Sequence, residues 1–425
     1  MEWLGDVPDE WDIYPFWHLF NRKEITNKTQ EQLLSVYLDR GVILHSEGGG
    51  MVHKPADNLE KYQLVEVNDF VMNNQQAWRG SVGVSPYKGI VSPAYLIFSF
   101  NKKICAPKFF KYFLRDKGVV DQFMIASMSV GTIQRQVKWH LLKTIQLSIP
   151  SLIEQNTIAN FLDTETARID NLISKQEKLI ELLEEQRKSI ISHAVTKGLN
   201  PNAPMKDSGV EWLGDVPEHW MTPSSKHLLE IPITDGPHET PNFVDDGVPF
   251  ISAEAISKGK IDFDKKRGYI TPELNAIYSK KYSPKIEDIY MVKSGATTGK
   301  VAMVETTEEF NIWSPLAVFR CNKNKVLPKF LLAVFNSSHF YDALVLNWSY
   351  GTQQNIGMGV LSNIEIPCPP LKEQAEIIQH LDAQNTKFDK LISTQSQLIE
   401  KLKEYRSSII SHAVTGKIDV REFGA

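Results

Sequence analysis

Cysteine is scarce in this 425-residue chain, and the three that are present lie far apart. Cys105, Cys321 and Cys368 are odd in number and form no C-x-x-C pair, so neither a disulfide framework nor a zinc site is expected. No run of about 18 apolar residues occurs, which argues against a membrane span. Residues 1–6 lack the basic and apolar regions of a secretion signal. These absences favour a protein of a reducing cytoplasm.

Motifs of the common catalytic chemistries are missing as well. There is no N-P-P-Y or D-P-P-Y adenine-methyltransferase motif, and no H-E-x-x-H, G-x-S-x-G or EF-hand pattern. The segment Gly295–Lys300 does not fit a phosphate-binding loop, because three residues instead of four separate its glycines and Val301 follows the lysine. We therefore expect a chain that is not an enzyme by itself and that holds no metal and no cofactor.

A strong positive charge is also absent, since the formal net charge is −4. The charge is uneven, however. Residues 14–147 contain 17 Lys and Arg against 10 Asp and Glu, a net of +7, whereas residues 221–366 contain 15 against 16, a net of −1. Any nucleic-acid surface in the second segment must therefore be a local patch. The length and the 42% hydrophobic content predict two to three globular domains.

The most prominent positive feature is an internal duplication. Glu2–Trp11 reads EWLGDVPDEW and Glu211–Trp220 reads EWLGDVPEHW, while Arg187–Thr196 reads RKSIISHAVT and Arg406–Thr415 reads RSSIISHAVT. The period is 209 residues at the first pair and 219 at the second, which indicates a duplicated unit of domain size. Each unit has a short opening segment, a mixed segment that differs between the copies, and a long helix. The tryptophans of the opening segments are expected to pack against the helices or the adjacent domain: Trp3, Trp11, Trp212 and Trp220.

The two predicted helices share one heptad register. Ser151 and Glu154 form a capping box at the start of the first helix, and Gly198 and Gly416 suit the two C-terminal stops. Such matched heptads predict a coiled coil in which polar Gln176 and Gln395 favour one register. The positions expected at a are Ile169, Gln176, Leu183, Ile190, Phe388, Gln395, Leu402 and Ile409, and those expected at d are Leu172, Leu179, Gln186, His193, Leu391, Leu398, Tyr405 and His412. The two histidines fit a place near a helix C-terminus or a contact to a partner better than a metal site.

The length of the helices suggests a spacer. Leu152–Val195 would extend about 66 Å as one helix, which is longer than a small domain needs for its own core. An antiparallel pair would place the two mixed domains at opposite ends, and a parallel pair would place them side by side. Each mixed domain shows strand-like runs, such as Tyr95–Phe98 and Leu316–Phe319, and short helical patterns at Pro107–Asp116 and Pro328–Asn336. We expect a compact α+β fold for each.

In this layout the chain resembles the specificity (S) subunits of type I restriction–modification systems, in which two variable domains alternate with two long helices. Local motifs are also similar to that family: Asp69–Met72 and Asp288–Met291, Ser294–Val301 (S-G-A-T-T-G-K-V), Ser92-Pro93 and Ser314-Pro315, Gly131–Gln134 and Gly351–Ile356, and Pro370–Gln374. The first domain has Ser81-Val82-Gly83-Val84 where the second has the fuller glycine turn. The ordered set, present twice, covers nearly the whole chain.

The resemblance implies a specific architecture and partners. Each variable domain would recognise one half of a bipartite, asymmetric site in double-stranded DNA, and the helices, as an antiparallel coiled coil, would set the gap and bind two methyltransferase subunits. Restriction/translocase subunits would join, and S-adenosylmethionine, ATP and Mg would act in those other subunits. The expected parts are recognition domain 1 at residues 1–150, helix 1 at 151–198, a linker with the second opening segment at 199–220, recognition domain 2 at 221–368, helix 2 at 369–416 and a tail at 417–425. A coiled-coil adaptor with two protein-binding heads is the alternative.

Base recognition needs polar or cationic side chains on loops, and backbone anchoring needs lysine or arginine. Candidates of this kind in the first domain are Trp78, Arg79, Ser81, Tyr87, Lys88, Thr132, Gln134 and Arg135. Candidates in the second domain are Lys293, Thr297, Thr298, Lys300, Thr352, Gln353, Gln354 and Asn355.

Overall fold

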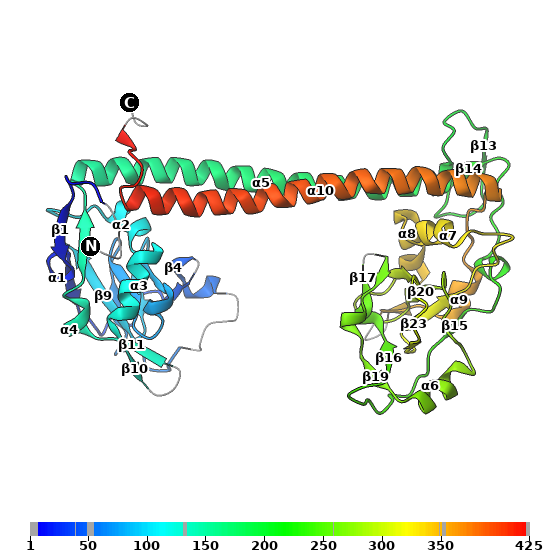
Figure 1. Ribbon diagram of the computed structural model, residues 1–425, viewed down its shortest axis with the longest axis horizontal. Helices are drawn as coiled ribbons and strands as arrows, with labels where there is room; N and C mark the ends of the chain where they lie inside the picture. The colour runs from blue at the N-terminus through cyan, green and yellow to red at the C-terminus, as the bar shows by residue number, and fades with distance from the viewer. Residues whose placement is uncertain are drawn as a thin grey trace. The chain divides into compact units, whose positions relative to one another are not determined.

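The computed structural model of the chain describes residues 7–38, 40–48, 55–130, 134–257, 259–347, 349–350 and 354–421 (Figure 1). The chain divides into two compact units. Unit 1 comprises Met1–Gln176 with Gln397–Ala425, and unit 2 comprises Glu177–Ser396. Each unit therefore contains one mixed domain together with one end of each long helix.

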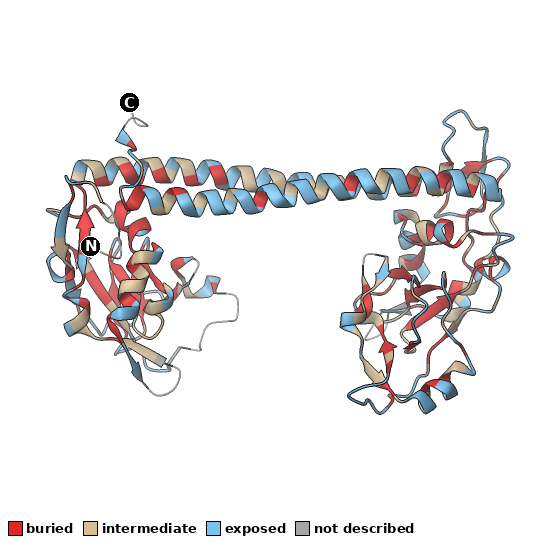
Figure 2. Cartoon of the chain, in the orientation of Figure 1, coloured by how far each residue is buried: buried red, intermediate tan, exposed pale blue. Residues whose placement is uncertain are grey.

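The mixed domain of unit 1 is built on a four-stranded antiparallel sheet in the order β2-β9-β6-β7. Two short helices pack beside it, and buried residues line the interior of the domain (Figure 2). The core is rich in phenylalanine, with Phe16, Phe70 and Phe98 fully buried. The elements of this unit are β1 (Asp12–Pro15), α1 (Phe16–Leu19), β2 (Phe20–Lys23), β3 (Leu34–Tyr37), β4 (Gly41–Leu44), β5 (Gln63–Val65), β6 (Phe70–Asn73), β7 (Val82–Val84), β8 (Gly89–Val91), β9 (Tyr95–Phe100), α2 (Pro107–Phe113), α3 (Lys117–Ile125), β10 (Ser127–Val130), β11 (Gln134–Val137), α4 (Trp139–Leu142) and β12 (Gln146–Ile149).

The mixed domain of unit 2 repeats this sheet in the order β15-β23-β20-β21, again antiparallel. A second, separate sheet has the order β19-β16-β22, and its Ile251 and Ile312 share a core with Tyr290 and Val318 of the first sheet. The elements are β13 (Met205–Asp207), β14 (Asp215–Pro217), β15 (Thr234–Asp235), β16 (Val248–Ile251), β17 (Ile256–Ser257), β18 (Lys260–Ile261), β19 (Gly268–Ile270), α6 (Pro272–Ser279), β20 (Ile289–Val292), β21 (Val301–Met303), β22 (Asn311–Ile312), β23 (Leu316–Phe319), α7 (Pro328–Phe335), α8 (Ser338–Asn347), β24 (Ser349–Tyr350), β25 (Gln354–Asn355) and α9 (Met358–Asn363). The expected strands and short helices of both domains are confirmed.

The same buried carboxylate holds the turn before the third strand of each sheet. Asp69 accepts hydrogen bonds from Lys23 Nζ at 2.5 Å and from the Glu66 backbone N–H at 2.8 Å. Asp288, 219 residues later, accepts from Arg320 Nη2 at 2.7 Å and from the Lys285 N–H at 2.9 Å. Burying a carboxylate is unfavourable unless it is paired, and both copies pair it with a cation and a turn N–H.

Two long helices complete the units. Helix α5 spans Leu152–Lys197 and α10 spans Leu371–Val414. In unit 1 the Asp170 carboxylate accepts two hydrogen bonds from Arg406, at 2.8 and 3.2 Å, while Ile158 and Leu162 share a core with Ala413. The two helix segments of unit 1 therefore run antiparallel.

The helix segments of unit 2 make the equivalent contacts. Arg187 donates to Asp389 at 2.6 Å, and Ala194 shares a core with Ile377 and Leu381. These two segments are also antiparallel. Both ion pairs join residues related by the 219-residue period, since Asp389 matches Asp170 and Arg406 matches Arg187.

The heptad register needs one correction. The residues at a are buried or half-buried, but seven of the eight residues predicted at d are exposed: Leu179 (38%), Leu391 (46%), Leu398 (40%), Tyr405 (48%) and the polar Gln186, His193 and His412. The next residue along the chain is more buried in each case, as Ile399 at 7% shows. The leucines at d are followed by isoleucine, as in Leu398-Ile399, so the sequence pattern allowed either position. The contact between the two helices is therefore formed by positions a and e. The apolar stripe on each helix is wider than this contact, so apolar residues at d remain exposed.

The opening segments are fixed by the first turn of each long helix. Trp11 donates its indole N–H to Glu154 at 3.0 Å, and Trp220 donates to Glu373 at 3.1 Å. Trp220 is fully buried and Trp11 is 5% exposed. The expected capping box is half right: Ser151 Oγ accepts from the Glu154 N–H at 3.3 Å, but the Glu154 carboxylate bonds the tryptophan. Packing of the tryptophans against the helices, expected from the repeat, is thus observed at both of these positions.

The glutamine after each of these glutamates is completely buried. Gln155 accepts from the Ala106 N–H at 2.7 Å and donates to the Ile104 and Pro150 carbonyls, both at 2.8 Å. Gln374 accepts from the Leu327 N–H at 2.8 Å and donates to the Lys325 and Pro369 carbonyls at 3.0 and 2.8 Å. The repeated E-Q pair therefore attaches each mixed domain to the helix that follows it.

Candidate nucleic-acid interface

The expected contact residues concentrate at one end of each four-stranded sheet. In unit 1, β6 ends and β7 begins at this end, and the loop between them carries residues 74–81. In unit 2 the loop between β20 and β21 carries residues 293–300 at the corresponding place. Since neighbouring strands are antiparallel, the start of β9 or β23 lies at the same end.

In unit 2 the glycine turn is bonded to the segment around β25. The Gly295 N–H donates to the Gln354 carbonyl at 3.1 Å, and the Ile356 N–H donates to the Lys293 carbonyl at 2.8 Å. Gly295 and Gly299 have φ values of 100° and 89°, which a residue with a side chain rarely adopts. Two motifs that are distant in the sequence are thus brought together, with Lys300, Gln354 and Asn355 exposed on them.

Unit 1 forms the equivalent turn directly before the segment expected to contain it. Residues Val82–Val84 are strand β7, so Ser81-Val82-Gly83-Val84 is not the counterpart of the glycine turn. That counterpart is the loop closed by Gly80, which has a φ of 96° and lies 219 residues before Gly299. The Val137 N–H at the end of β11 donates to the Asn74 carbonyl at 3.3 Å and joins this loop to the hairpin β10–β11.

An aromatic and two guanidinium groups meet on this loop. The Arg79 and Arg135 guanidinium carbons lie 4.9 and 6.0 Å from the Trp78 ring centroid. Trp78 also donates its indole N–H to the Gln75 carbonyl at 3.0 Å, which holds the ring in place. Arginine stacked on an aromatic ring is pre-positioned for phosphate or guanine contacts.

Several expected contact residues have other roles. The Ser81 hydroxyl, on a residue that is 5% exposed, donates to the Val36 carbonyl at 3.1 Å, and the equally buried Thr298 donates to the Gly295 carbonyl at 2.7 Å. Both hydroxyls make hydrogen bonds within the protein, and the DNA contact expected of these two residues stays a prediction. Tyr87 and Lys88 follow β7 at the opposite end of the sheet, where Lys88 pairs with Glu31 at 2.8 Å.

Other expected contacts can be placed only in part. Thr132, Thr352 and Gln353 lie outside the described residues, and only the backbone of Gln134 is described, in β11. Thr297 is half-buried in the glycine turn. Lys293 is directed to a carboxylate, because its side chain is 12% exposed and its ammonium lies 3.3 Å from Asp235.

Asp235 organises a cationic cluster that the sequence reasoning missed. Besides Lys293, its carboxylate lies 2.6 Å from the Lys281 ammonium and 3.1 Å from His238 Nε2. Although burial opposes ionisation, the hydrogen bonds and charges of Lys281 and Lys293 hold the pKa of Asp235 below its ordinary value. The cluster therefore carries more positive than negative charge at the same sheet end, and Lys281 and His238 are its exposed members.

A local signal for this cluster existed in the sequence. Asp235 is followed by Gly236, at which a Cβ atom would lie 2.0 Å from the Ile312 carbonyl oxygen. The sequence Asp235-Gly236-Pro237-His238 is typical of such a close approach. The lysines of the cluster lie about 50 residues further along the chain, so only the fold shows that they meet Asp235. Within the described part of the chain, no group of three or more His, Cys, Asp or Glu residues is arranged to hold a metal ion.

Comparison with known proteins agrees with this architecture. Residues 217–404 match the family model described as the type I restriction modification DNA specificity domain. The specificity subunit of the type I restriction enzyme MjaVIII of Methanocaldococcus jannaschii is 25% identical over 98% of this chain and 94% of its own length. That of the enzyme EcoKI of Escherichia coli K12 is 22% identical over 87% of this chain and 78% of its own length.

Solved structures share the fold. A chain from a structure of a type I R-M system matches with a TM-score of 0.69 and 16% identity over 97% of this chain and all of its own length. The HsdS subunit of Thermoanaerobacter tengcongensis matches with a TM-score of 0.54 and 16% identity over 97% of this chain and 98% of its own. No helix among the described residues is both long enough and apolar enough to cross a membrane. The second half of the chain thus matches the type I restriction modification DNA specificity domain, and nearly the whole chain is similar to the specificity subunits of type I restriction enzymes.

Proposed function

We propose that the chain is the sequence-recognising subunit of a type I restriction–modification complex and that each mixed domain contacts one half of a bipartite site in double-stranded DNA. The observation that carries this proposal is the recurrence of one loop assembly at the same sheet end in both units. The scaffold of the assembly is the same, while its exposed side chains differ. Two divergent surfaces on matched scaffolds suit an asymmetric DNA site.

The exposed chemistry of both sheet ends suits DNA. In unit 1, Arg79 and Arg135 beside the Trp78 ring supply guanidinium groups for phosphate or base-edge contacts. In unit 2, Lys281 beside Asp235 supplies an exposed cation in a domain without net positive charge, and His238 adds an exposed hydrogen-bonding side chain. Such cations anchor the DNA backbone, and Lys300, Gln354 and Asn355 on the adjacent turns are candidates for base contacts.

The long helices act as the spacer in this proposal. Helix α5 has 46 residues and a length of about 69 Å. We propose that α5 and α10 pair antiparallel along their whole length, as their segments do within each unit, and thereby fix the number of unread base pairs. The domain limits proposed are residues 1–150 and 221–368 for recognition and residues 151–198 and 369–416 for the helices.

The exposed side of the same helices offers a docking surface. Leu179, Leu182 and Leu391 are 38–49% exposed in unit 2, and Leu398 and Tyr405 are 40% and 48% exposed in unit 1. Apolar side chains left over from a helix seam favour a protein partner. We propose that two methyltransferase subunits bind here, that restriction/translocase subunits join them in the cytoplasm, and that S-adenosylmethionine, ATP and Mg act in those subunits.

Methylation mapping tests the proposal. Cells that express this chain with a modification subunit of its system would be sequenced with a single-molecule method that detects methylated adenine. A single bipartite motif with an unread gap is expected. An assembled complex that adds no methylation would refute the recognition role and would favour the adaptor with two protein-binding heads.

A further inference from the structure

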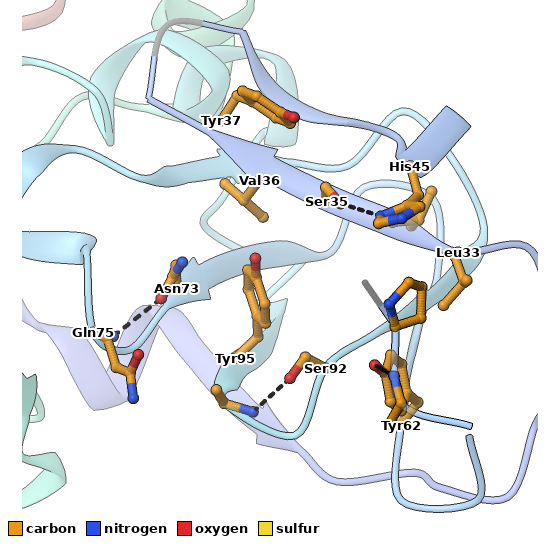
Figure 3. Close-up of a pocket in the computed structure, with 14 residues that line it drawn as sticks. Leu33, Ser35, Val36, Tyr37, His45, Tyr62, Asn73, Gln75, Ser92 and Tyr95 are labelled. Atoms are coloured by element: carbon orange, nitrogen blue, oxygen red, sulfur yellow. Dashed lines mark hydrogen bonds between the residues drawn. The ribbon is translucent and has the colours of Figure 1, made fainter. Parts of the chain in front are cut away.

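Unit 1 contains a cavity of about 520 Å³ beside its candidate DNA-contacting loop (Figure 3). Its walls come from β3, from His45, from Pro55, Ala56 and Tyr62, from the end of β6 and from the turn before β9. This volume lies within the range of roughly 300–1,000 Å³ that is usual for small-molecule sites. The cavity is therefore large enough to hold a ligand of several rings or a single ring with its substituents.

The side chains around this cavity are aromatic, aliphatic and polar and carry no fixed charge. Tyr37, Tyr62, Tyr95 and His45 line it, and none of its described lining residues is Lys, Arg, Asp or Glu. Binding an unpaired ion in an uncharged, partly buried site is unfavourable. The chemistry therefore selects a neutral, planar ligand that can stack on aromatic rings.

Hydrogen-bonding groups surround the aromatic rings, and some of them already have partners within the protein. Ser35 Oγ lies 3.0 Å from His45 Nδ1, and the Tyr37 hydroxyl donates to the Gly48 carbonyl at 2.7 Å. Burial raises the pKa of Tyr95, so its hydroxyl remains a protonated donor at neutral pH. The Gln75 side-chain amide makes no hydrogen bond to the described part of the chain, and its donor and acceptor atoms form the pair that complements an adenine edge.

The cavity is continuous with the loop proposed to contact DNA. Gln75 lines the cavity, and its own carbonyl accepts the indole N–H of Trp78. Asn73, at the end of β6, lines the cavity too and accepts a hydrogen bond from the Gln75 N–H at 3.1 Å. A base that leaves the stack beside Trp78 would therefore meet the cavity through the same loop.

We propose that this cavity binds a single nucleobase. The source is either a base unstacked from the DNA half-site or the base of a free nucleoside, because both present the same neutral ring and hydrogen-bonding edge. The DNA-borne form rests on the proposed DNA-binding function of this domain, whereas the free-nucleoside form does not.

The test uses the assembled complex of the full chain with its modification subunits and duplexes that carry its mapped site. A mismatch is placed opposite each base of the unit 1 half-site in turn, except the methylated adenine. If the protein unstacks a base at one position, a mismatch opposite that base removes the cost of breaking its base pair. The affinity for the duplex should then rise about tenfold or more at that position. We expect one such position, and we expect Gln75→Leu to abolish the gain while the exposed control Gln146→Leu retains it.

A parallel measurement distinguishes the two sources. Saturation-transfer NMR on the same complex reports contact with adenosine, guanosine, cytidine or thymidine. A free-nucleoside site is identified if the complex gives a nucleoside signal in the NMR measurement, Gln75→Leu loses that signal, and no mismatch raises the affinity for DNA. Normal DNA binding with neither effect overturns the cavity proposal while the recognition function stands. If DNA is not bound at all, the recognition function and the DNA-borne form fail together, and the nucleoside signal alone decides the free form.

Discussion

The two units attach their domains to the helices in one way and present different chemistry at their sheet ends. At the attachment, tryptophan, glutamate and glutamine make the same hydrogen bonds in both copies, as Gln155 and Gln374 show. At the sheet end, unit 1 has stacked arginines beside an uncharged aromatic cavity, and unit 2 has a cationic cluster around Asp235. The attachment is thus a fixed structural part, and the sheet end is the part that can change without disturbing it.

The attachment should give the largest effect on stability. Gln374→Leu leaves the buried Leu327 N–H and the Pro369 carbonyl without partners and the Lys325 carbonyl with only the Cys368 thiol, and each unsatisfied group costs about 1–3 kcal/mol. We expect a loss of about 3 kcal/mol or more in the free energy of unfolding, and the same from Gln155→Leu, measured by urea denaturation. The control Gln397→Leu, on an exposed face of α10, should change it by less than about 0.5 kcal/mol. Strongly unequal losses in the two copies would show that the attachments are not equivalent.

The exposed leucines should give the next largest effect, on assembly. Leu179→Glu in unit 2 and Leu398→Glu in unit 1 place a charge in a proposed apolar contact. Each should weaken the docking of one methyltransferase subunit by about thirtyfold or more, so native mass spectrometry should find one bound subunit instead of two. The neighbouring changes Lys178→Glu and Gln397→Glu serve as controls. If both leucine variants still bind two subunits, the docking surface lies elsewhere.

A smaller effect is expected at the cationic cluster of unit 2. Lys281→Gln removes one exposed cation that we propose to be near a phosphate. The slope of log affinity against log salt should become less steep by about 1, with little change in the preferred sequence. Fluorescence titration at several salt concentrations measures this slope. Lys280→Gln is the adjacent control. An equal change of the salt slope in both variants would show that the slope reports only the net charge of the domain and not a contact of Lys281.

The smallest effect concerns the one cap that the copies do not share. Ser151 accepts the Glu154 N–H at the start of α5, whereas Pro370 occupies the matching place before α10. Ser151→Ala should therefore lower the free energy of unfolding by about 1 kcal/mol. Urea denaturation beside Ser407→Ala, an exposed helix position, measures it. An unchanged stability would mean that the Trp11–Glu154 contact alone fixes this helix start.

Regular local patterns allowed much of the fold to be predicted. The duplication, both long helices and the strands at β9 and β23 follow from periodicity and repeated motifs. The helix seam was misplaced by one residue because Leu398-Ile399 and the similar pairs put two apolar residues side by side, and only packing decides which one is buried.

The candidate site was less predictable. The glycine turn around Gly295 was found from its motif, but its counterpart at Gly80 lacks that motif and shares only its conformation. Ser81 and Thr298 have suitable side chains for DNA, yet burial assigns their hydroxyls to nearby carbonyls. Gly236 after Asp235 gave one local signal for the cluster, but its lysines and the walls of the cavity beside Gln75 come from distant parts of the sequence, so composition and spacing did not predict either arrangement.

The central claim is that the two units recognise DNA independently on a common scaffold. Replacing residues 14–147 with the corresponding segment of another specificity subunit, and then mapping methylated adenines in cells, tests it most directly. One half of the bipartite motif should change while the other half and the gap length stay the same. A change in both halves, or in neither with the complex assembled, would contradict it.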